Sequence, residues 1–111
     1  MVPLDLVGAD GQKHTIDFIV DTGFDGDICL PSEMIQRLGF PLFEEYVTTL
    51  ADGQKAILSG YEGQAEWHSR VRTVLVLESA GDPLLGMRIL WRNRITIDNY
   101  ANGPVIVEEL G

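Results

Sequence analysis

The chain has 111 residues, 45% of them hydrophobic and 23% charged, which predicts one globular domain over residues 1–111. Its formal net charge of −9 argues against a nucleic-acid partner and against binding to an anionic membrane surface, since both attract basic faces. There is no apolar run as long as a membrane span and no signal-peptide pattern at the N-terminus. The single cysteine, Cys29, excludes an intrachain disulfide, so we expect a cytoplasmic protein.

Short stretches of apolar residues, many of them alternating with polar ones, predict strands along the whole chain. They cover residues 2–7, 14–20, 28–30, 46–50, 55–61 continuing through 64–67, 71–77, 94–98 and 105–107. Asp-Gly pairs mark two hairpin turns, at residues 8–11 and 51–54.

Two short helices are also expected. Pro31 and Gly39 bracket the first, at residues 32–38. Gly86 leads into the second, which runs through about Trp91 and buries Met87, Leu90 and Trp91. Many short strands with regular turns and two short helices predict an all-β domain that is closed or barrel-like.

One stretch carries most of the chemical information. The apolar residues Phe18, Ile19 and Val20 run directly into Asp21, Thr22 and Gly23. This pattern indicates a buried strand that delivers one carboxylate to a turn, which is costly unless the acid is hydrogen-bonded, protonated or functional. The simple alternative is a strand that ends in an Asp-containing turn.

The Asp-Thr-Gly tripeptide after two apolar residues resembles the active-site loop of aspartic proteases. The longer run, residues 21–25, is most similar to the retroviral branch and to small single-domain prokaryotic proteins of the retropepsin-like type. Leu84-Leu85-Gly86 is similar to the second element of that family, in which two apolar residues and a glycine enter a short helix beneath the catalytic loop. The resemblance implies the acid-protease fold and an aspartic endopeptidase that needs no cofactor and no metal.

The resemblance also implies the number of chains in the active form. Peptide hydrolysis in this family needs two carboxylates that work as general base and general acid. This chain has one Asp-Thr-Gly and is too short for the two-lobed form, so we expect a homodimer in which each chain supplies one acid. In this interpretation Asp21 is the catalytic acid and base, Thr22 hydrogen-bonds across the dimer, and the backbone N–H of Gly23 approaches the carboxylate.

The remaining site residues follow from the same resemblance, with a peptide or protein as the substrate. Ala51, Asp52 and Gly53 are expected at the tip of a lid hairpin, and Phe24, Asp25 and Leu84 beside the substrate. Asp25 pairs with Arg88 in one interpretation, and Arg88 is simply solvated in the other. Residues 105–107 either join a sheet between two chains, as retroviral chain ends do, or pair within their own chain.

Two other functions stay open on the sequence alone. Phe24 lacks the hydroxyl that many family members carry at this position, which leaves a catalytically weak or inactive dimeric peptide-binding module as the alternative. A third interpretation is an unrelated β-domain in which Asp-Thr-Gly is only a turn. Metal chemistry is not expected, because His14, His68 and Cys29 show no ligand spacing.

Overall fold

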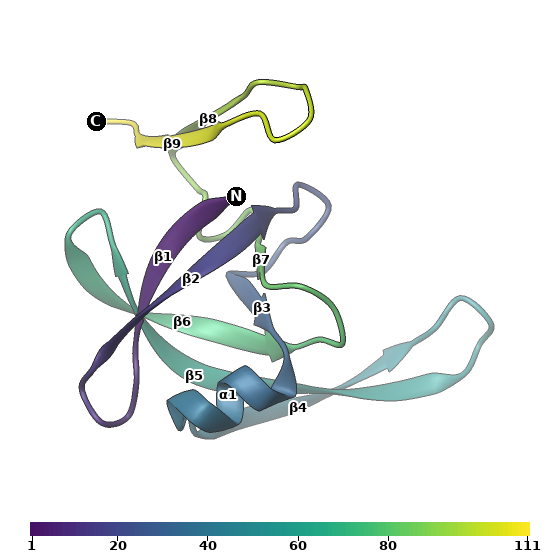
Figure 1. Ribbon diagram of the computed structural model, residues 1–111. Coiled ribbons are helices and arrows are strands. Elements are labelled where there is room, and N and C mark those ends of the chain that lie inside the picture. Colours follow the sequence, from purple (N-terminus) through teal and green to yellow (C-terminus); the bar gives the residue numbers. More distant parts are fainter.

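The computed structural model describes the backbone of residues 1–111 and every side chain except that of Thr48 (Figure 1). Over this range the protein is mostly β, as the sequence predicts. Its nine strands and one helix are β1 (Val2–Val7), β2 (Lys13–Val20), β3 (Ile28–Leu30), α1 (Ser32–Leu38), β4 (Leu42–Thr49), β5 (Lys55–Trp67), β6 (Arg70–Glu78), β7 (Leu84–Leu85), β8 (Asn93–Ile97) and β9 (Val105–Glu109).

Seven strands form one sheet in the order β1-β2-β7-β3-β6-β5-β4, and β1 also pairs with β5. Most neighbours are antiparallel, but β2 runs parallel to β7 and β3 runs parallel to β6. In the β1–β2 hairpin Val2 lies opposite Phe18, so the start of β1 and the end of β2 lie at the same end of the molecule.

The two remaining strands, β8 and β9, form a separate two-stranded sheet at the C-terminus (Figure 1). Residues 105–107 therefore pair within their own chain. Two side-chain contacts join this sheet to the β5–β6 hairpin. The ring of His68, in the turn, hydrogen-bonds to Asn93 of β8 at 2.6 Å, and Arg70, the first residue of β6, forms an ion pair with Glu109 of β9 at 2.6 Å.

The core follows from the alternation of the strands. Val2, Leu4 and Leu6 of β1 are buried, and Phe18 of β2 is fully buried beside them. Full burial of a phenylalanine side chain stabilises the folded state by roughly 1.5–3 kcal/mol.

Helix α1 packs on this core through Ile35 and Leu38. Its C-terminal cap is Gly39 at φ 72°, whose N–H donates to the carbonyls of Ile35 and Gln36. A left-handed residue at this position satisfies the free carbonyls of the last turn, and glycine adopts it without strain. Among the described residues, the structure has no helix with both the length and the apolar character that crossing a bilayer requires.

The prediction of a second helix at residues 86–91 is wrong. This segment forms consecutive turns, in which Leu90 N–H donates to Gly86 at 3.3 Å and Trp91 N–H donates to Arg88 at 3.3 Å. Arg92, at φ 62°, reverses the chain before a second helical turn can form.

The same turns correct the predicted burial of the segment. Leu90 is buried as expected, together with Ile89, but Met87 is exposed and Trp91 is 77% exposed. A turn this short presents two successive side chains to the core and leaves those on either side of them in solvent.

Candidate functional site

Asp21 lies at the point where β2 leaves the sheet. Its backbone N–H donates to Leu85 of β7 at 2.9 Å, so the parallel β2–β7 pairing fixes where the loop begins. The carboxylate is half-buried, and its Oδ1 accepts a hydrogen bond of 2.9 Å from the Gly23 N–H. The Phe24 N–H donates to the Asp21 carbonyl at 3.2 Å and closes a tight turn. The backbone therefore sets both the position and the direction of this acid.

The loop after Asp21 is locked to the segment after β7. Backbone N–H groups of that segment donate to carbonyls of the loop: Gly86 to Asp27 at 2.9 Å, Met87 to Phe24 at 2.7 Å and Arg88 to Gly26 at 3.1 Å. The two backbones come so close that a Cβ atom on Gly86 would lie 2.1 Å from the Gly26 carbonyl oxygen. Only glycine fits there, which joins the two sequence motifs in one structural unit.

Phe24 packs inside this unit. A Cβ atom on Gly86 would lie 2.6 Å from the Cδ2 of the Phe24 ring, and one on Gly26 would lie 2.6 Å from its Cζ. The ring thus covers both glycines and is half-buried. Thr22 and Asp25 of the same loop are exposed.

The charge of Asp21 affects the pKa of the Cys29 thiol in β3. Burial raises the pKa of the Cys29 thiol to about 11, and the negative charge of Asp21 adds to the shift. Cys29 is a free, buried cysteine. Its high pKa keeps the thiol protonated at neutral pH, which does not suit a nucleophile.

Asp27 is the residue that the sequence analysis missed. It is 3% exposed, and its Oδ2 accepts a hydrogen bond of 3.0 Å from the Leu75 N–H of β6. The Nε of Arg88 lies 3.9 Å from its Oδ1. Arg88 therefore faces Asp27, whereas Asp25 points to solvent, so neither the Asp25 pairing nor a fully solvated arginine describes the structure. One signal in the sequence was available: Asp27 directly precedes the apolar run of β3.

The hairpin of β4 and β5 carries the predicted lid tip. Ala51, Asp52 and Gly53 are exposed in its turn, where Gly53 takes φ 86° and Asp52 Oδ1 accepts a hydrogen bond of 2.9 Å from the Gln54 N–H. Figure 1 shows the hairpin projecting from the body of the molecule, away from α1 and the first strands.

Of the predicted site residues, the structure brings the Asp21 loop and Leu84 together. Leu84 is half-buried in β7 and lies opposite both Ile19 and Cys29. Residues 51–53, which the sequence predicts as a lid tip, are instead carried at the far end of the long β4–β5 hairpin.

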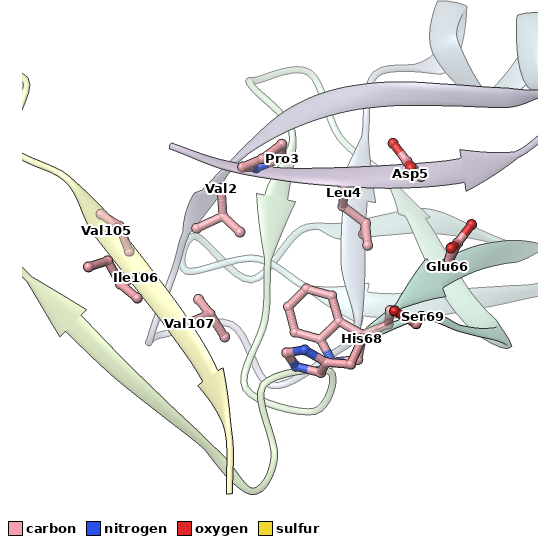
Figure 2. Close-up of a pocket in the computed structure, with 11 residues that line it drawn as sticks. Val2, Pro3, Leu4, Asp5, Glu66, His68, Ser69, Val105, Ile106 and Val107 are labelled. Carbon is pink, nitrogen blue, oxygen red and sulfur yellow. The ribbon is translucent and has the colours of Figure 1, made fainter.

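A groove of about 520 Å³ lies between the start of β1, the end of β5 and strand β9. Figure 2 shows Val2 and Pro3 on one side of it and Val105, Ile106 and Val107 on the other. On this side β1 pairs with β5 only from Asp5 onward, so the backbone edge at residues 2–4 is open to the groove.

Compared with known protein families and with curated proteins, the chain has no match.

Proposed function

We propose that the protein is a homodimeric, cytoplasmic aspartic endopeptidase with a retropepsin-like fold. The observation that carries the proposal is the half-buried Asp21 carboxylate, which backbone hydrogen bonds hold at the junction of two interlocked loops. Such an arrangement presents an acid rigidly to a substrate, as catalysis requires. A turn with a purely structural role needs neither the hydrogen-bonded segment after β7 nor the close approach of Gly86 to the Asp21 loop.

The strand pairings support a closed barrel of this type. β1 pairs with β2 on one edge and with β5 on the other, so the pairings run in a ring through β2, β7, β3, β6 and β5. The Asp21 loop and the segment after β7 meet at one end of this ring. This is where the retropepsin-like fold carries its active site.

The chemistry needs two copies of Asp21, one from each protomer. One carboxylate takes a proton from a water molecule, whose oxygen attacks the carbonyl carbon of the peptide bond. The other carboxyl group gives its proton to the carbonyl oxygen. When the C–N bond breaks, the first carboxyl group gives the proton that it took from water to the leaving amine, and the other carboxylate takes a proton from a hydroxyl of the intermediate, which restores the starting state.

The groove beside β1 is the face that we assign to the second protomer. The β1–β2 register puts the open edge at residues 2–4 at the same end of the molecule as Asp21. Strand addition to an open edge joins two chains through main-chain hydrogen bonds. Thr22 is exposed beside Asp21, and in the proposed dimer it hydrogen-bonds to the partner's loop.

The β4–β5 hairpin acts as the lid over bound substrate. Its side chains Val47, Ile57 and Leu50 are apolar and exposed, which suits contact with an extended peptide. Closing the lid would bring Ala51, Asp52 and Gly53 to the substrate and exclude water from the carboxylates.

A peptide-binding module of the same fold is the alternative, and one observation favours it. Within the described part of the chain, the hydrogen bond to the Asp21 carboxylate comes from Gly23 N–H, and Phe24 has no hydroxyl to add a second. A less constrained carboxylate pair would hydrolyse slowly while the cleft still held peptides.

The test is cleavage of a mixed peptide library from pH 3 to pH 8 by the parent chain, Asp21→Asn and Asp17→Asn, with sedimentation of all three. Asp17 is an exposed acid of β2 and serves as the matched control. We expect cleavage by the parent and Asp17→Asn, none by Asp21→Asn, and dimers throughout. Dimers without cleavage would favour the binding module, and a monomer at high concentration would refute the shared site.

A further inference from the structure

A pocket of about 230 Å³ lies at the root of the β4–β5 hairpin, and Asp21 is not among the residues that line it. Strands β4, β5 and β6 form its walls together with the two interlocked loops. Aromatic and charged side chains dominate its lining: Phe43, Tyr46, Tyr61, Asp27, Glu62 and Arg88.

Asp27 lines this pocket and carries an unsatisfied acceptor. Asp27 is 3% exposed, and within the described part of the chain its Oδ1 has no hydrogen-bond partner. The nearest cation, Arg88 Nε, is 3.9 Å away, beyond the reach of a hydrogen bond, and its side chain is 65% exposed. A buried carboxylate oxygen without a donor is costly, so a group that donates to it binds with a strong advantage.

The charges around the pocket favour a cation. Asp27 and Glu62 line it, and Tyr46 at its wall donates its hydroxyl to Glu44 at 2.8 Å, which brings a third acid close. Against these three acids stands one base, Arg88, whose exposed side chain can turn into solvent. The aromatic walls add to the attraction, because tyrosine and phenylalanine rings bind cations through their faces.

We propose that this pocket binds the ammonium or guanidinium end of a basic side chain, of the lysine or arginine type, in a peptide held beside the lid. The charged end donates to Asp27 Oδ1 and to Glu62, and the methylene stem lies along Tyr46 and Tyr61. The site needs neither Asp21 nor hydrolysis, so it stands or falls separately from the protease proposal.

The experiment uses the full chain carrying Asp21→Asn, so that no peptide is cleaved. Two capped tripeptides, Ala-Lys-Ala and Ala-norleucine-Ala, are titrated into labelled protein while the amide signal of Leu75 is followed by NMR. The Leu75 N–H binds the other oxygen of Asp27 and therefore reports on that carboxylate. Because hydrogen bonds to charged groups are strong, we expect the lysine peptide to bind about tenfold more tightly or better. Equal binding, or no shift with either peptide, would overturn the proposal.

Variants on the same background separate the site from general charge attraction. Glu62→Gln should weaken lysine-peptide binding by about threefold, whereas Glu45→Gln, an exposed acid of β4 that does not line the pocket, should leave it unchanged. Arg88→Gln should strengthen binding by about threefold, because it removes a competing cation. If Arg88→Gln instead lowers the thermal stability and leaves the affinity unchanged, Arg88 is the partner of Asp27 and the proposal fails.

Discussion

The Cys29 thiol reports on the charge of Asp21. Its pKa rises from an ordinary 9.0 to about 11, chiefly through burial and further through Asp21. The folded protein therefore holds this proton more tightly than the unfolded chain does. The resulting stabilisation is complete below pH 9 and is lost as the pH rises through 11. Two pKa units correspond to about 2–3 kcal/mol of unfolding free energy, and we expect a decrease of that size between pH 9 and pH 11.

Urea denaturation from pH 8 to pH 11.5 measures this decrease when the parent is compared with Cys29→Ala, because other titrating groups cancel in the difference. Asp21→Asn should make the decrease smaller by lowering the pKa of Cys29, and the alkylation rate of the thiol should rise at lower pH in that variant. Asp17→Asn, the exposed acid of β2, is the control. If the alkylation profile is the same in the parent and in Asp21→Asn, the charge of Asp21 does not reach Cys29 and the reasoning is refuted.

Two further predictions concern the two interlocked loops and the β4–β5 hairpin, the proposed lid. Gly86→Ala should lower the unfolding free energy by about 3–5 kcal/mol, because the new methyl group would lie 2.1 Å from the Gly26 carbonyl oxygen. Gly81→Ala, in an open loop, should change the unfolding free energy by less than about 0.5 kcal/mol. If the two substitutions lowered stability equally in thermal unfolding, the close approach of Gly86 to the Gly26 carbonyl would be contradicted. Replacing Val47 and Ile57 together by threonine should leave stability within about 0.5 kcal/mol, since both are exposed, but weaken binding of apolar peptides several-fold in calorimetry. Unchanged peptide affinity would refute the proposal that the β4–β5 hairpin is part of the peptide-binding surface.

The sequence predicted the strands best where one face is buried. In β1 the alternation of Val2, Leu4 and Leu6 with polar neighbours gave the bounds that the structure has. The start of β4 was missed by four residues, since the strand begins at Leu42 rather than Tyr46. Residues 42–45 are all exposed, so pairing with β5 forms this part of the strand and no burial pattern marks it.

The prediction of a second helix at residues 86–91 is wrong for a different reason. Its residues have adequate helix propensity, but tertiary contacts decide their structure. The N–H groups of Gly86, Met87 and Arg88 are bound to the Asp21 loop, and the left-handed Arg92 ends the segment. Helices this short gain little stability from helix propensity. The hydrogen bonds to the Asp21 loop and the following strand β8 therefore determine the backbone conformation of this segment.

The acids of the candidate site show the same limit. That Asp21 ends a buried strand could be derived from the apolar run before it. Whether Asp25 or Asp27 faces Arg88 depends on how the backbone leaves the turn, and residue types alone do not contain that information. The structure turns Asp27 inward because the Leu75 N–H of β6 binds its carboxylate, an interaction between residues 48 positions apart.

The interlocked loops also explain how Phe24 fits the proposed protease site. A hydroxyl at this position would fix the carboxylate by a side-chain hydrogen bond. Here the ring of Phe24 instead fills the volume over Gly26 and Gly86, and the Gly23 N–H orients the carboxylate. Rigidity in the loop thus comes from packing and backbone hydrogen bonds, both of which are complete in one chain. In the proposed dimer the separation of the two carboxylates is left to the contact between protomers, so substitutions at Thr22 should alter catalysis more than stability.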